Sequence, residues 1–444
     1  AGIMLILSGM LFAKGPEGSK SQSYNKGQDI RARTLITVNN WEYWLRNDGQ
    51  SAHTPDGNFG GIYPGGTAST IYQDGIIWGA RVNDNAPSKP EIRVGGQTYN
   101  VGTSAGYVIG EGASRTASEV TPIWRIRRDW RIFFDGGDGT GAATLGIPAV
   151  ISEAAARFQV AQSAVTEDQQ LEIINQYRDD WNNWPTELGA PFYDVNGNGT
   201  YEPGTEEDLN GNGQIEVGEI EEPGIAGADQ VVWYVNHDLD DGTTVALYGS
   251  PSIGLEIRNA IWAYNQPGAT LGQLLYKQYT IINKSEWVLD SMFISQWSDP
   301  DVGQFTDDLV GSDSARSLGF AYSGFLTDND FDAFGLPPAA SGYDFFQGPL
   351  VDGVAGEARN RNGVDDADDF GIFDLQRVGP GKINLPQLSF GYFAAGSPIS
   401  DPGPFGDYEA TEEWYNLING FLPNDFSTDP TPFLVGFGPR RGQA

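Results

Sequence analysis

The chain has 444 residues, of which 59 are acidic and 26 basic, and it contains no cysteine. The resulting formal charge of -33 repels nucleic acid and anionic membranes, so neither is expected as a partner. Without cysteine, disulfides, thiolate metal sites and cysteine nucleophiles are excluded, and the many carboxylates favour hard cations instead.

The chain opens with an apolar stretch, residues 1–13, which has the length of a secretion signal and is too short to span a membrane. A buried first strand or helix is the alternative interpretation. Residues 14–30 are rich in Gly, Ser and Lys and suit a linker or arm. The two segments together predict a secreted protein, located outside the cell or on its surface.

A mostly β domain is expected over residues 31–190, because short apolar runs such as 76–82 are separated by turn residues. Gly95 and Gly96 lie between two further runs and predict a two-residue hairpin turn. Residues 167–184 differ, since their apolar side chains recur at helical spacing, and they predict a helix.

A tandem calcium-loop insertion is expected over residues 191–225. The segment from Asp208 to Glu219 fills every required position of the loop pattern D-x-[DN]-x-[DN]-G-x5-E. In such a loop alternate residues direct oxygen atoms at one calcium ion, and the last acid closes the shell with both oxygens. Ile215 is expected to anchor the loop in a core. The expected ligands are Asp208, Asn210, Asn212, Gln214, Glu216 and Glu219.

An earlier copy of the pattern starts at Asp194. Its last position is Thr205 rather than an acid, so Glu206 or Asp208 is needed to complete it. Because asparagine replaces aspartate at two positions of each loop, we expect a dissociation constant of about 0.1–1 mM. Asn-Gly turns without an ion are the alternative for both loops. The expected ligands of the earlier loop are Asp194, Asn196, Asn198, Thr200 and Glu202.

A C-terminal domain similar to a β-sandwich is expected over residues 226–444, where apolar runs such as 230–235 and 255–262 alternate with turn signals. Residues 410–421 predict a short helix. Two acidic loops in this region are weaker calcium candidates, with solvated loops as the alternative. Their expected ligands are Asp299, Asp301, Asp307, Asp308, Asn360, Asn362 and Asp365.

The tandem loop resembles the calcium loops of thrombospondin type 3 repeats and of dockerins, over about residues 194–221. Pro191 before the loops and Pro203 between them argue against the flanking helices of an EF-hand. The resemblance implies calcium-dependent folding of an extracellular loop.

Several phrases are similar to those of large uncharacterised secreted bacterial proteins, which are often cargo of the type IX secretion route. The similarity spans most of residues 34–440 and implies secretion, but it brings no activity with it. The phrases include Trp181-Asn182-Asn183-Trp184-Pro185 and Trp297-Ser298-Asp299-Pro300-Asp301.

Residues for catalysis are scarce in the sequence. The two histidines, His53 and His237, are far apart in the chain, and no phosphate-binding glycine motif is present. A glycosidase needs only two suitably separated carboxylates, so the residue types leave hydrolysis open. Aromatic residues reach 12%, and most are expected to pack in cores rather than to stack on sugars.

The expected fold class is mainly β, with β-sandwich domains, long calcium-binding loops and one or two short helices. The expected function is that of a noncatalytic, extracellular, calcium-binding structural or adhesive protein, such as a subunit of a surface layer or filament. A strand edge or the N-terminal apolar segment would then pair with a neighbour. The expected partners are Ca2+ and copies of the chain or other cell-surface proteins. The alternative is a secreted polysaccharide-binding protein or glycoside hydrolase.

Overall fold

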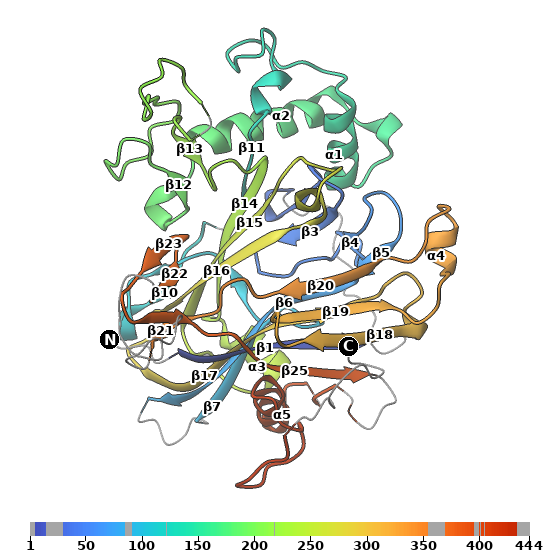
Figure 1. Ribbon diagram of the computed structural model, residues 1–444, viewed down its shortest axis with the longest axis vertical. Helices are drawn as coiled ribbons and strands as arrows, with labels where there is room; N and C mark the ends of the chain where they lie inside the picture. Colours follow the sequence, from blue (N-terminus) through green and yellow to red (C-terminus); the bar gives the residue numbers. More distant parts are fainter. Residues whose placement is uncertain are drawn as a thin grey trace.

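The structure is a computed structural model, in which strands outweigh helices at 35% against 19%, and this confirms a mainly β fold. Figure 1 shows the strands in the middle of the molecule, with α1 (Pro148–Phe158) and α2 (Glu167–Asn182) above them and α5 (Tyr408–Ile418) below. No helix in the described ranges is long and apolar enough to cross a membrane. The structure describes residues 5–14, 30–84, 91–120, 122–216, 218–353, 369–394, 399, 401–403 and 405–432.

Two large sheets form the centre of the fold. The first has the strand order β25-β1-β17-β6-β7, and its members are β25 (Gln387–Ala394), β1 (Leu5–Lys14), β17 (Val288–Asp299), β6 (Gln73–Asn83) and β7 (Ile92–Gly96). The second has the order β11-β14-β15-β16, with β8 also paired to β14, and its members are β11 (Trp124–Arg127), β14 (Gln230–His237), β15 (Leu255–Ala263), β16 (Tyr276–Asn283) and β8 (Ser104–Ala105).

The two large sheets pack face to face in a sandwich-like arrangement. Ile76 and Trp78 of β6 meet Leu255 and Ile257 of β15 in one buried cluster. Side chains of a strand alternate between its faces, so Ile77 points to the opposite side of its sheet, where it joins the cluster around α5. The side chains on the two faces of β6 therefore belong to two different hydrophobic cores.

Helices α1 and α2 cover the outer face of the second sheet. Thr166 begins α2 with a capping box, in which its side chain and that of Gln169 each accept a hydrogen bond from the other's main chain. Ile174 and Tyr177 of α2 are buried against Trp233 of the sheet. The helix predicted over residues 167–184 is thus confirmed. The predicted calcium insertion contacts this helix through Tyr201.

Smaller elements complete the described structure. A third sheet contains β2 (Arg33–Ile36), β3 (Glu42–Arg46), β4 (Gly61–Ile62) and β5 (Ser69–Ile71), and a fourth contains β18 (Asp308–Asp313), β19 (Leu318–Ser323) and β20 (Ala340–Asp344). Two-stranded ladders join β9 (Val108–Ile109) with β10 (Thr116–Ala117), β12 (Phe192–Tyr193) with β13 (Glu222–Pro223), β21 (Leu350–Asp352) with β24 (Lys382–Asn384), and β22 (Gly371–Phe373) with β23 (Gln376–Val378). The remaining helices are α3 (Asp241–Tyr248), α4 (Asn329–Asp332) and the 3-10 turns η1 (Ile30–Ala32), η2 (Gly112–Ser114), η3 (Trp130–Phe133), η4 (Gln162–Ala164), η5 (Thr186–Leu188), η6 (Thr270–Gln273) and η7 (Phe305–Asp307).

The hairpin turn predicted at Gly95 and Gly96 is wrong. Both glycines continue β7, which pairs antiparallel with β6. A Cβ atom on Gly95 would lie 2.8 Å from the indole nitrogen of Trp78, and one on Gly96 would lie 2.2 Å from the carbonyl oxygen of Ile76. The pair is needed for close approach of two strands rather than for a turn.

One buried carboxylate ties four sheets together. Asp74 of β6 is fully buried and accepts hydrogen bonds from the hydroxyls of Tyr43 (β3, 2.5 Å) and Tyr343 (β20, 2.5 Å). Lys277 of β16 places its ammonium 2.6 Å from the same oxygen, and the hydroxyl of Ser51 donates to the other one. Burial raises the pKa of Asp74, but Lys277 and the hydroxyl donors outweigh it, so the pKa lies below its usual value. Asp74 is therefore an ionised anchor for all four sheets.

Candidate metal centre

The predicted calcium insertion projects from the helical end of the molecule. It leaves the body at β12 and returns at β13, which pair antiparallel so that Tyr193 faces Glu222. Figure 1 shows it as the green loops beside α2. The two paired strands hold the ends of the insertion together, so residues 194–221 form one outward excursion of the chain.

In the later loop, the carboxylate of Asp208 lies at the centre of a ring of main-chain N–H groups. Its oxygens accept hydrogen bonds from Gly211 (2.7 Å), Asn212 (3.1 Å) and Gly213 (2.7 Å). The side-chain oxygen of Asn210 also accepts from the main chain of Asn212, at 2.9 Å. These bonds wrap the chain tightly around its first acid, as the spacing of the pattern predicts.

The earlier loop repeats this arrangement. The carboxylate of Asp194 accepts hydrogen bonds from the main-chain N–H groups of Asn198 (3.1 Å) and Gly199 (2.6 Å). Asn196 accepts from the main chain of Asn198 at 3.0 Å, and Asn198 accepts from that of Thr200 at 2.7 Å. Two segments with the same spacing therefore adopt the same local fold.

Glu219 closes the later loop. Its two carboxylate oxygens accept hydrogen bonds from the main-chain N–H groups of Asn210 (3.2 Å) and Glu216 (3.1 Å), at opposite ends of the loop. The side chain is only 5% exposed. This is the position at which the sequence pattern requires the bidentate acid.

Glu221 has the corresponding role in the earlier loop. One of its oxygens accepts a hydrogen bond from the main chain of Glu202, the counterpart of Glu216. The side chain is fully buried at 0% exposure, and Oε2 has no hydrogen-bond partner among the described residues. Burial raises the pKa of Glu221, and the charges of Asp194 and Glu202 raise it further against the effect of the main-chain hydrogen bond. Within the described ranges this buried carboxylate forms no ion pair with a basic side chain, so its charge is not compensated there.

Pairing between the ends of the two loops brings Glu221 to this place. Glu206 and Ile220 form an antiparallel bridge, and the N–H of Glu221 donates to the carbonyl of Thr205 at 2.8 Å. The sequence prediction named Glu206 or Asp208 as the acid that completes the earlier loop. In the structure Glu206 takes part in this bridge, and the carboxylate of Asp208 is bonded within its own loop. The acid next to the earlier loop is Glu221, which follows the end of the later loop.

The anchor of the insertion also differs from the prediction. Ile215 is 39% exposed, so the expectation that it packs into a core is wrong. The residue at the same position of the earlier loop, Tyr201, packs against the core below α2 and donates a hydrogen bond from its hydroxyl to the carbonyl oxygen of Trp181, at 2.7 Å. The earlier loop lies against the body while the later loop extends from it, which explains why only one of the two side chains is covered.

Among the described residues, the other predicted ligands, Asp299, Asp301, Asp307 and Asp308, form no group of three or more acids that could hold a metal ion. Asp307 accepts a hydrogen bond from the hydroxyl of Ser323, and Asp308 accepts one from the main chain of Val302. Burial, followed by the charges of nearby acids that include Asp299 and Asp301, raises the pKa of Tyr99. The remaining predicted ligands, Asn360, Asn362 and Asp365, lie outside the described residues.

Within the described ranges, no three His, Cys, Asp or Glu side chains are grouped closely enough to hold a metal ion by themselves. A cation in either loop of the insertion would need amide and main-chain oxygens as well. The asparagines at alternate positions supply such oxygens, which suit calcium better than they suit transition metals.

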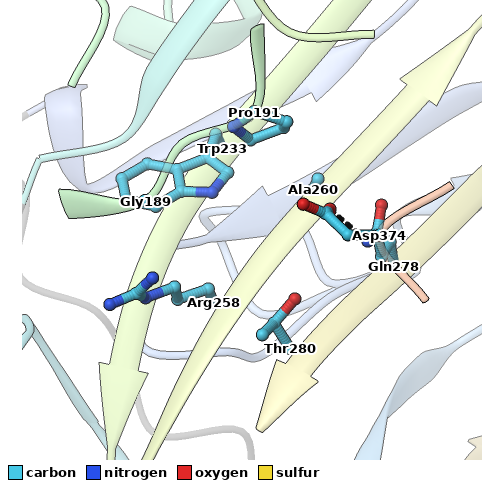
Figure 2. A pocket seen from close by; sticks show the side chains of 8 residues that line it. All are labelled: Gly189, Pro191, Trp233, Arg258, Ala260, Gln278, Thr280 and Asp374. Atoms are coloured by element: carbon cyan, nitrogen blue, oxygen red, sulfur yellow. Dashed lines mark hydrogen bonds between the residues drawn. The ribbon is translucent and has the colours of Figure 1, made fainter. Parts of the chain in front are cut away.

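A shallow hollow, open to solvent, lies on the second large sheet (Figure 2). On one side of the hollow, the side-chain amide of Gln278 donates a hydrogen bond to a carboxylate oxygen of Asp374 at 3.3 Å. The Nε of Arg258 donates to a carboxylate oxygen of Glu256 at 2.9 Å. Among the described residues that line it, Asp374 is the one acid. The hollow is lined by Gly189, Pro191, Trp233, Arg258, Ala260, Gln278, Thr280 and Asp374.

Both histidines and several of the tryptophans are buried. His53 and His237 are buried at 5% and 2% exposure, and burial lowers the pKa of His53 to about 4. Several tryptophans are at most 7% exposed and pack in cores, as the sequence predicts for most aromatic residues, among them Trp44, Trp181, Trp184, Trp233 and Trp262.

Comparisons of the chain with protein-family models, with curated proteins and with solved structures found no match. The function must therefore be inferred from the geometry of the insertion and of the sheets.

Proposed function

We propose that this chain is a noncatalytic structural or adhesive protein of the extracellular space, and that its insertion binds two calcium ions, one in each loop. The observation that carries the proposal is the repeated geometry. Each loop is wound around a first aspartate, Asp194 or Asp208, and each is closed by a buried glutamate, Glu221 or Glu219.

The earlier loop has a specific need for a cation. Asp194 and Glu202 are close enough to Glu221 for their charges to repel it, and Oε2 of Glu221 is buried without a hydrogen-bond partner among the described residues. A calcium ion there would neutralise this charge and would accept the free oxygen as a ligand. The loop glycines already give the chain the tight turns that such a shell requires.

Calcium at these positions would act on stability rather than on chemistry. The segment 219–221 carries both closing acids, and Tyr201 connects the earlier loop to α2. Binding would hold the two loops to each other and to the body, which supports a protein that has no disulfides.

Calcium should raise the melting temperature of the chain by several degrees relative to EGTA. With a dissociation constant of about 0.1–1 mM, roughly 10 mM calcium stabilises each site by about 1.4–2.7 kcal/mol. Isothermal titration calorimetry should give two ions per chain. Identical melting curves in calcium and EGTA would contradict the proposal.

Single substitutions separate the two sites. Asp194→Asn and Asp208→Asn should each remove one ion from the stoichiometry and part of the thermal shift, and the double variant should remove both. Asp352→Asn is the matched control, because Asp352 has a side chain that is 83% exposed and lies outside the insertion. The control should retain two ions.

The calcium effect should weaken in acid. Because the pKa of Glu221 lies above its ordinary value of 4.5, protons compete with calcium at the earlier loop in the range above pH 4.5. Protonation also relieves the buried charge, so the metal-free protein gains stability as pH falls through this pKa. The difference in melting temperature between calcium and EGTA should therefore be larger at pH 7 than at pH 5. In a Glu221→Gln variant this pH dependence should diminish, and an unchanged dependence would contradict the assignment.

A further inference from the structure

Strand β1 is paired differently from the other strands of the described structure. It runs parallel to both of its neighbours, with Gly9 opposite Ser295 of β17 and opposite Ser389 of β25. The other named ladders in the described ranges are antiparallel. Strand β1 lies between the edge strand β25 and β17, so it is not itself an edge strand (Figure 1).

The position of β1 does not follow from its neighbours in the sequence. The next elements along the chain are η1 and β2, and β2 belongs to the third sheet. Residues 15–29 connect β1 to η1, and a stretch of that length reaches at most about 50 Å. Strand β1 is therefore held in its sheet by main-chain pairing, and such pairing can be made by a strand of any chain.

Removal of β1 would divide the first large sheet. Strands β17 and β25 would each present an unpaired edge, separated by the width of one strand. The sequence of β1, LILSGMLFAK, is mostly apolar and suited to fill that slot. Both the slot and the strand that fits it are present in every copy of the chain.

We propose that β1 is an exchangeable strand, and that residues 5–14 of one copy occupy the slot between β17 and β25 of a second copy. Repetition of this exchange from one copy to the next links copies head to tail. The proposal names the partner for the structural role proposed above and rests on that role. It does not depend on calcium, so the calcium experiments and the following ones fail independently.

A disulfide between two single variants tests the exchange, because the natural chain has no cysteine to interfere. Gly9→Cys and Ser389→Cys are placed on separate chains with tags of different mass, and the two are co-expressed and oxidised. Since Gly9 and Ser389 are opposite each other in the ladder, a mixed disulfide should form in high yield. Gly9→Cys paired with Ser427→Cys is the control and should give little.

The outcome that overturns the proposal is equally specific. If the mixed disulfide is no more abundant than in the control, while a Gly9→Cys/Ser389→Cys double variant closes within single chains, β1 belongs to its own chain. EGTA should leave the yield of the mixed disulfide unchanged.

A synthetic peptide of residues 5–14 provides a second measurement on the unaltered chain. The labelled peptide should bind at one per chain and should convert linked copies into single ones, as seen by fluorescence anisotropy and mass photometry. A peptide with Leu11→Pro should fail, because proline removes a main-chain donor from the middle of the strand. Equal effects of both peptides, or of neither, would contradict the exchange.

Discussion

Replacement of Lys277 by methionine should lower the free energy of unfolding by about 3–5 kcal/mol at neutral pH, because it leaves the buried carboxylate of Asp74 without its counter-charge. Methionine retains most of the length and apolar surface of lysine, so the loss reports charge rather than a cavity. Chemical denaturation at pH 7 measures the effect. We expect this to be the largest stability change produced by a single substitution proposed for this chain.

The pH dependence identifies the cause. In the natural chain the pKa of Asp74 is lowered, so its contribution to stability is present above the unfolded value and is lost as pH falls through the folded one. Without Lys277 that carboxyl is easier to protonate, and the gap between the variant and the natural chain should narrow between pH 7 and pH 4. An Asp74→Asn/Lys277→Met double variant should recover part of the loss.

Lys284→Met is the matched control for Lys277, since the described structure has no ion pair at Lys284. Its free energy of unfolding should change by less than about 0.5 kcal/mol. Equal losses in the two lysine variants would mean that the Asp74 cluster contributes no special stability.

Glu221→Gln should have effects of opposite sign with and without calcium. In EGTA it removes a buried negative charge beside Asp194 and Glu202, so the variant should melt at the same or a higher temperature than the natural chain. In calcium it removes a charged ligand, and the affinity of the earlier loop should fall on the order of ten- to a hundredfold. Calorimetric titration and melting curves in both buffers measure the two effects.

Glu207→Gln is the control for Glu221. Glu207 lies in the same insertion and is exposed, so its substitution removes an equal charge without removing a closing acid. The Glu207→Gln variant should still bind two calcium ions per chain. A Glu221→Gln variant that loses stability in EGTA and retains full calcium affinity would refute the role given to this residue.

The sequence predicts elements whose stability is local. Residues 167–184 form α2 nearly as expected, and the runs 230–235 and 255–262 lie in β14 and β15, because apolar spacing follows the face that each element buries. Apolar spacing does not predict helix α1, because its buried face includes the charged residues Glu153 and Arg157. These two side chains form an ion pair with a nitrogen–oxygen distance of 3.8 Å. In a sequence, charged residues that are buried as an ion pair cannot be distinguished from charged residues on a solvated surface.

The site was predictable in part, for a similar reason. The wrapping around Asp208 follows from the spacing within one loop, so the pattern locates it. Glu221 depends on the register between residues 205–207 and 219–221, which no spacing within a loop reveals. The partners of Asp74 are more distant still, since Lys277 is 203 positions away in the chain. Contacts of that kind are decided by how sheets pack, and a single sequence does not display them.

The cluster around Asp74 bears on where the protein can fold. In many exported proteins the elements of the fold are cross-linked by disulfides, and these form only in an oxidising compartment. Here the tie between four sheets is a carboxylate held by one ammonium and three hydroxyls, and the chain has no cysteine. None of these groups changes with redox potential. The same cross-tie therefore forms in reducing and in oxidising surroundings, and the folding of this chain needs no thiol oxidase.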